Sequence, residues 1–235
     1  MFNRFNNNEK QYSLPESITN FMCKVYGWMG LALALTAATA YGIYQYTPLF
    51  EAIMFNEFIV ITLFVAQILL VITLSIFSKR MSFGVAATMF LFYAILSGIT
   101  LSVIFAIYQL PSLVTILAVT IATFIVMSLY GYYTKTDLTS MGNIFLMALL
   151  GIIIAGVVNL FLHNTFIHFL CAVLGVIIFT GLMAYDTQKI KELWHTLTEK
   201  GEPTNKIALL SALILYLDVV NLFLKLLQLF GKKKK

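Results

Sequence analysis

The last hydrophobic run of the chain decides its fold: Ile207-Ala-Leu-Leu-Ser-Ala-Leu-Ile-Leu-Tyr-Leu-Asp-Val-Val-Asn-Leu-Phe-Leu-Lys-Leu-Leu-Gln-Leu-Phe230. As a helix it covers about 36 Å, enough to cross a hydrocarbon layer of about 30 Å. Its most polar side chains recur at steps of seven, three, four and three positions: Ser211, Asp218, Asn221, Lys225 and Gln228. These steps place all five on one helical face. In a membrane such a face turns toward protein or water, so we expect this helix at the centre of a bundle.

The composition predicts an all-α integral membrane protein. The 235 residues are 60% hydrophobic and 11% charged, whereas soluble domains are about 25% charged. Seven runs are long enough to be transmembrane helices: residues 25–46, 58–78, 83–108, 112–133, 142–162, 166–188 and 207–230. Short connections favour antiparallel neighbours, so we expect residues 1–235 to form a single transmembrane domain, with six helices around the seventh. Residues 1–24 are expected to be a mostly polar tail.

The basic residues predict the orientation of the bundle. Lys and Arg occur in residues 1–24 and in the second, fourth and sixth links, and are missing from the first, third and fifth links. Because basic residues favour the cytoplasmic side, we expect a cytoplasmic N-terminus. The N-terminal residues also lack the apolar run and cleavage site of a signal peptide.

The C-terminal lysines, residues 232–235, oppose this pattern. Seven spans that start inside place these four lysines outside, whereas a re-entrant seventh segment would keep them inside. We expect seven full spans, because the last run is long enough to cross.

Two aspartates lie deep in the last two runs. Asp186 belongs to Gly181-Leu-Met-Ala-Tyr-Asp-Thr-Gln188, and Asp218 to the seventh run. An ionisable residue at membrane depth costs roughly 3 kcal/mol, which indicates a function. Both lie roughly 15 Å from the cytoplasmic end of their helices, so they can meet. Two carboxyl groups in contact can share one proton, or together make a weak contact with a hard cation such as Ca²⁺.

Other residues carry weaker signals. Arg80 ends the second span, where it either holds a carboxylate or anchors the helix at the membrane surface. Cys23 and Cys171 have no disulfide or metal spacing and are interpreted as small apolar residues. His163 and His168 flank an outer link and are interpreted as interfacial rather than metal-binding. Close helix packing is expected at two glycine pairs: Gly27 with Gly30, and Gly151 with Gly156.

The two aspartate motifs resemble the Bax-inhibitor-type family, also called transmembrane BAX inhibitor motif proteins, and most closely its bacterial members. The motifs are Ala184-Tyr-Asp-Thr-Gln188 and Leu215-Tyr-Leu-Asp-Val-Val-Asn-Leu-Phe-Leu224. Three more segments are similar to family segments: Lys79-Arg-Met-Ser82, Ser128-Leu-Tyr-Gly-Tyr-Tyr-Thr-Lys135 and Met141-Gly-Asn-Ile-Phe-Leu-Met-Ala148. The resemblance implies six helices around a central seventh and a pH-sensitive Ca²⁺ leak. It also implies that Asp186 and Asp218 form the gate and sensor, with Arg80 as the basic partner of Asp186.

The function expected from these observations is therefore a cation leak in a bacterial plasma (inner) membrane. We expect no enzyme activity and no cofactor, with Ca²⁺ and H⁺ as the ions transported or sensed. The expected partners are the lipid bilayer, cations and other membrane proteins, and not nucleic acid. Ser211, Asn221, Lys225 and Gln228 would support the aspartate pair.

Three alternatives remain. An intramembrane aspartyl protease also uses a Tyr-Asp on one span, and Tyr185-Asp186 matches it, but no glycine precedes Asp218. A retinal protein has Asp and Lys four positions apart in its last span, whereas Asp218 and Lys225 are seven apart. A regulatory or scaffold membrane protein that carries no ions is the third, because a fold does not fix a function.

Overall fold

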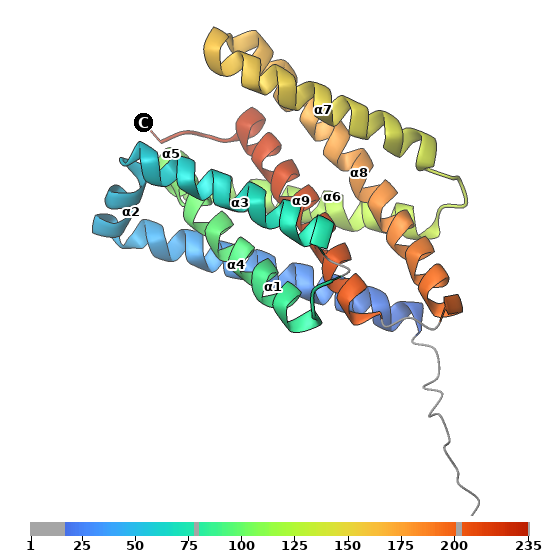
Figure 1. The fold of residues 1–235 in the computed structure, drawn as a ribbon. Helices are drawn as coiled ribbons and strands as arrows, with labels where there is room; N and C mark the ends of the chain where they lie inside the picture. Colours follow the sequence, from blue (N-terminus) through green and yellow to red (C-terminus); the bar gives the residue numbers. More distant parts are fainter. Residues whose placement is uncertain (1–16, 78–79, 201–203, 235) are drawn as a thin grey trace, which may run out of the picture.

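The structure, a computed structural model, describes residues 17–77, 80–200 and 204–234 and is helical through most of this length (Figure 1). The helices in these residues are α1 (Ile18–Gln45), α2 (Thr47–Met54), α3 (Glu57–Phe77), α4 (Phe83–Leu101), α5 (Val103–Ile107), α6 (Leu110–Tyr133), α7 (Thr139–Leu162), α8 (Thr165–Lys200) and α9 (Asn205–Phe230). Seven spans are long and apolar enough to cross a membrane, with α4 and α5 forming one span, Phe83–Ile107. The predicted class, an all-α membrane protein with seven spans, is confirmed.

The first helix begins earlier than predicted. Its N-cap is Ser17, whose side chain accepts a hydrogen bond from the Asn20 backbone N–H at 3.2 Å. Such a cap satisfies one of the free N–H groups of the first turn. Phe21 and Met22 are buried in the first turns. Residues 18–24 therefore belong to the helix and not to a polar tail, and residues 1–16 lie outside the described part of the chain.

The sixth span continues beyond the predicted end at residue 188. Helix α8 extends to Lys200, and polar contacts hold its extension. The Lys191 Nζ donates to the Tyr132 carbonyl at 2.9 Å, and Lys189 pairs with Glu192 at 2.7 Å. The predicted break at Gly201 and Pro203 falls outside the described residues.

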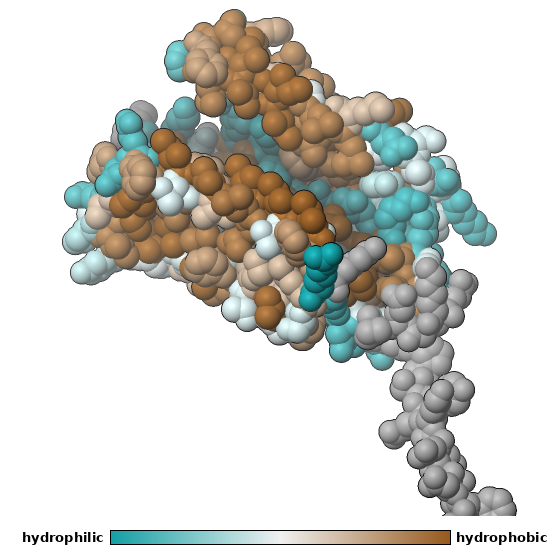
Figure 2. Space-filling view, viewed as in Figure 1, coloured by the Kyte–Doolittle hydropathy of each residue, from teal (hydrophilic) through white to brown (hydrophobic). Residues whose placement is uncertain are grey.

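Helix α9 is the central helix, as its polar face predicted. It packs directly against α1, α4, α6 and α8. The other two spans stand farther out, α3 along α4 and α7 along α8 (Figure 1). Their outward faces are almost wholly hydrophobic, as Figure 2 shows for the visible face. Four of the six surrounding spans thus form the immediate lining of α9.

The C-terminal tail lies at the end of the bundle opposite the start of α9. The Gln109 N–H donates to the Lys232 carbonyl at 2.9 Å, and the Lys234 N–H donates to the Ile107 carbonyl at 2.8 Å. The tail therefore follows the link between α5 and α6, and α9 crosses the full bundle. We call this end the C-side. The opposite end, where α1 and α9 begin and α8 ends, is the N-side.

Candidate functional site

The two aspartates meet in the interior of the bundle. Asp186 projects from α8 and Asp218 from α9, and their carboxyl groups lie close enough to interact with each other. Two carboxyl groups in such proximity can share one proton. Asp218 is only 5% exposed, and its Oδ2 has no hydrogen-bond partner in the described part of the chain. The two acidic groups therefore lie together inside the bundle, with one buried carboxyl oxygen of Asp218 unpartnered.

Glycines let α8 approach its neighbours at this depth. A Cβ at Gly131 of α6 would overlap the backbone carbonyl of Ala184, and a Cβ at Gly142 of α7 would overlap the ring of Tyr185. The residues immediately before Asp186 thus lie against two glycines. This close approach fixes the height of Asp186 in the bundle.

The two residues after Asp186 fix the rotation of α8. The hydroxyls of Thr187 and Ser128 bond each other at 2.9 Å, which joins α8 to α6. Gln188 accepts from the Leu138 N–H at 2.9 Å and donates from Nε2 to the Thr136 carbonyl at 2.8 Å. These bonds tie α8 to the link between α6 and α7, and Asp186 then faces α9.

Helix α9 is fixed by a buried tyrosine two residues before Asp218. The Tyr216 hydroxyl bonds the Thr36 hydroxyl of α1 at 2.8 Å. Thr36 also bonds the Ala94 carbonyl of α4 at 2.9 Å. Tyr216 is fully buried. The rotation of α9 is therefore tied to α1 and α4 on one side while Asp218 faces α8 on the other.

The rest of the polar face runs from Asp218 toward the C-side. Asn221 donates to the Leu217 carbonyl of its own helix at 2.8 Å. The stem of Lys225 packs over Gly175 of α8, where an added Cβ would come within 2.9 Å of it. At the C-side end of this polar face, the Gln228 Nε2 forms a hydrogen bond with the ring of His168 on α8, 2.9 Å from Nδ1. Ser211, nearer the N-side, is buried.

The family described as inhibitor of apoptosis-promoting Bax1 matches residues 18–235, which include the whole aspartate site. The chain belongs to this family. It is 41% identical to the inner membrane protein YbhL of Escherichia coli strain K12, over 92% of this chain and 93% of that protein.

Two further bacterial relatives cover similar shares. An uncharacterized protein of Borreliella burgdorferi is 40% identical, over 96% of this chain and 97% of its own length. An uncharacterized membrane protein of Streptococcus pyogenes serotype M3 is 31% identical, over 92% of this chain and 93% of its own. With seven apolar helices and such relatives, this Bax1-inhibitor-family chain belongs in the lipid bilayer of a bacterial inner membrane.

Arg80 is not brought to the aspartate pair. It is exposed in the turn after α3, with its N–H bonded to the Phe77 carbonyl. Helix α3 packs along α4 rather than along α8. Within the described residues no ion pair joins Arg80 to either aspartate, and the role expected for Arg80 stays a prediction. Lys79 lies outside the described residues.

Within the described residues, the cysteine, histidine and acidic side chains give no further support for a metal site. Cys171 is buried and Cys23 exposed, and both are free. Within residues 17–77, 80–200 and 204–234, no three His, Cys, Asp or Glu side chains come close enough to hold a metal ion. Any cation at the aspartate pair would complete its coordination with backbone oxygens or water.

The sequence did not identify the glycines at which neighbouring helices approach closely. Gly27, Gly30, Gly151 and Gly156 have nothing within 4 Å of an added Cβ, so the predicted packing there is wrong. The close approaches occur instead at Gly131 and Gly142. Both belong to the segments that resemble the family, and that resemblance was the one signal that pointed to them.

Proposed function

We propose that this protein is a pH-sensitive cation leak, with Ca²⁺ as the cation, and that Asp186 and Asp218 form its gate and proton sensor. The observation that carries the proposal is the close approach of the two carboxyl groups, one on α8 and one on α9, inside the bundle. In this proposal the pair shares one proton, and that proton controls the gate.

The shared proton supports a closed state. While it is bound, one hydrogen bond joins the two central helices at mid-depth. When it leaves, two carboxylates face each other, and at about 4 Å they repel by about 4 kcal/mol if the effective dielectric constant is about 20. A buried hydrogen bond contributes only about 1 kcal/mol, so repulsion dominates. Loss of the proton therefore pushes α8 and α9 apart or attracts a cation between them.

The donor chemistry supports Ca²⁺ as the cation. Ca²⁺ prefers carboxylate and carbonyl oxygens and takes about 6–8 of them. Asp218 Oδ2 is buried and unpartnered, and deprotonation frees further oxygen lone pairs. Two carboxylates alone make a weak site, which suits passage better than storage. In this proposal the N-terminus is cytoplasmic, and Arg80 acts only if the end of α3 moves toward α8.

The test is Ca²⁺ flux into liposomes that contain the purified protein, measured across pH. We expect wild-type flux to rise with pH near neutrality. Asp186→Asn and Asp218→Asn should each abolish that pH dependence, because an amide carries no shared proton and does not repel the remaining carboxylate. Glu192→Gln, on the exposed end of α8, removes one carboxylate outside the pair and should behave as wild type. An unchanged pH profile in both aspartate variants would refute the proposal.

The packing around Asp218 disfavours the protease alternative. A protease must admit a substrate backbone beside its catalytic carboxyl groups. Asp218 is buried, and Leu215, one turn before it on the same side of α9, is fully buried as well, which leaves little space for a substrate. Cleavage of a membrane substrate that a transition-state analogue blocks would support the protease instead. A scaffold protein predicts that neither flux nor cleavage depends on the aspartates.

A further inference from the structure

The C-terminal tail has a defined position although it consists of lysines. Tyr108 and Lys233 form an antiparallel bridge, and the Lys232 N–H donates to the Ser112 hydroxyl at 3.0 Å. These contacts use the backbone of the tail, which leaves the side chains of Lys232 and Lys233 exposed. Lys234 instead donates to the Tyr44 hydroxyl at 2.9 Å. The tail thus presents two ammonium groups from a docked segment at the C-side.

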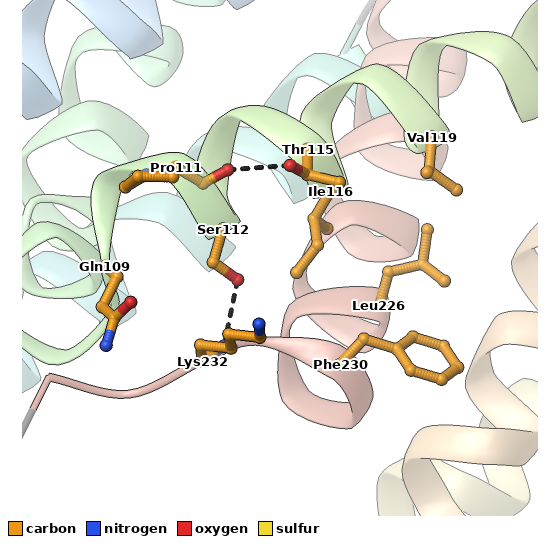
Figure 3. Close-up of a pocket in the computed structure, with 9 residues that line it drawn as sticks. All are labelled: Gln109, Pro111, Ser112, Thr115, Ile116, Val119, Leu226, Phe230 and Lys232. Carbon is orange, nitrogen blue, oxygen red and sulfur yellow. Dashed lines mark hydrogen bonds between the residues drawn. The ribbon is translucent and has the colours of Figure 1, made fainter.

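A cavity of about 390 Å³ lies beside this docked tail, between α6 and α9 (Figure 3). This volume falls in the range of about 300–1,000 Å³ that is typical of ligand pockets. The rim carries Gln109, Ser112 and Lys232, and the wall carries no acidic residue. The cavity is therefore suited to a ligand with a negative group at the rim.

The cavity changes from polar to apolar along α6. Val119 lies ten positions after Gln109, about 15 Å deeper along the helix. Leu226 of α9 lies between Val119 and Phe230, and Phe230 lies near the rim beside Lys232, as Figure 3 shows. Val119 is 48% exposed and Phe230 69% exposed, so the apolar wall opens toward lipid. A small soluble anion would gain nothing from contact with this apolar wall, whereas an acyl chain would be stabilised by it.

The charge of the tail points to the class of lipid. No other link at the C-side contains Lys or Arg. Each basic residue near an anionic membrane surface adds about fivefold to binding, from about 1 kcal/mol. From the rim charge and the apolar wall we propose that this cavity binds one anionic phospholipid of the C-side leaflet, with its phosphate at Lys232, the exposed Lys233 adding positive charge beside the rim, and an acyl chain along Phe230 and Val119.

The test compares lipids kept by the purified full chain in detergent, counted by native mass spectrometry. The probes are phosphatidylglycerol and phosphatidylethanolamine with identical acyl chains. We expect wild type to retain the anionic lipid preferentially. Lys232→Gln with Lys233→Gln should lower that retention by about fivefold per lysine. The tail is held through its backbone, so this variant keeps its docking contacts. Lys135→Gln, at the N-side end of α6, is the matched control and should have no effect.

A second pair of variants tests the cavity itself. Val119→Phe fills the deep part and should reduce retention of the anionic lipid, whereas Val126→Phe, two turns farther along the same face of α6 and 62% exposed, should not. Two results would overturn the proposal. One is an equal loss in Lys135→Gln, which would mean that net charge alone attracts the lipid. The other is full retention in Val119→Phe, which would mean that the anion binds the lysines without entering the cavity.

Discussion

Helices α7 and α9 have nearly the same length but opposite places in the bundle. Together with α3, α7 is the most apolar span, and only Gly142 and Ile152 of its 24 residues are buried. Helix α9 carries a polar face, and 56% of an 18-residue hydrophobic window within it is buried. In water the more apolar helix would occupy the core. Here lipid is as apolar as leucine, so polar groups and close packing decide which helix lies inside.

The contrast between the inner and outer helices is largest at the glycines where two helices are in contact. We expect Gly131→Val to abolish folding or to destabilise the protein by about 3 kcal/mol or more, because the side chain would overlap the Ala184 backbone. Gly151→Val on α7 meets nothing within 4 Å and should leave the protein monodisperse. Yield and unfolding in detergent measure both. Equal tolerance of the two variants would mean that α6 and α8 do not approach closely.

A charge placed on the lipid side of α7 tests the other half of the comparison. Leu150 lies near the middle of α7 and is 63% exposed. Leu150→Asp should cost about 3 kcal/mol in insertion, because that carboxylate finds no interior partner. A membrane-insertion reporter carrying α7 measures this, with Leu150→Ala as the control. Insertion of the Asp variant as efficient as that of the Ala variant would contradict the lipid-facing position.

Removal of one buried hydroxyl should weaken the anchoring of α9 by a smaller amount. Tyr216→Phe deletes the hydrogen bond to Thr36 and should lower the free energy of unfolding by about 1 kcal/mol. Tyr133→Phe removes a hydroxyl from a side chain that is 73% exposed and should have little effect. Chemical unfolding of both variants in the same detergent gives the difference. A stability loss in Tyr133→Phe equal to that in Tyr216→Phe would argue against the buried contact.

The smallest effect is expected at the exposed start of α7. The Thr139 hydroxyl and backbone N–H hold the pKa of the Asp137 carboxyl below its usual range. The ionised group therefore stabilises the fold above about pH 4, and the contribution is lost as the pH falls through the lowered pKa. Asp137→Ala should lower the thermal midpoint slightly at neutral pH, with a difference that shrinks in acid. A difference that grows in acid would contradict this sign.

The sequence predicted the parts of the site that depend on one helix at a time. The polar face of α9 followed from its residue spacing, and the depths of Asp186 and Asp218 followed from counting along two helices. The glycine contacts did not, because the approach at Gly131 depends on how α6 and α8 are rotated together. The contact expected for Arg80 was not found among the described residues, because it depends on where the end of α3 lies relative to α8. The docked tail is held by backbone groups, which every residue carries, so its lysines gave no sign of its position.

The central claim is that Asp186 and Asp218 share a proton whose loss opens the path. Infrared spectroscopy of the reconstituted protein measures this directly through the carbonyl band of a protonated carboxyl group. The account predicts a band that disappears with rising pH over the same interval in which Ca²⁺ flux increases, and that is missing when both aspartates are replaced by Asn. A band that persists unchanged while the flux rises, or that is equally strong without the two aspartates, would contradict it.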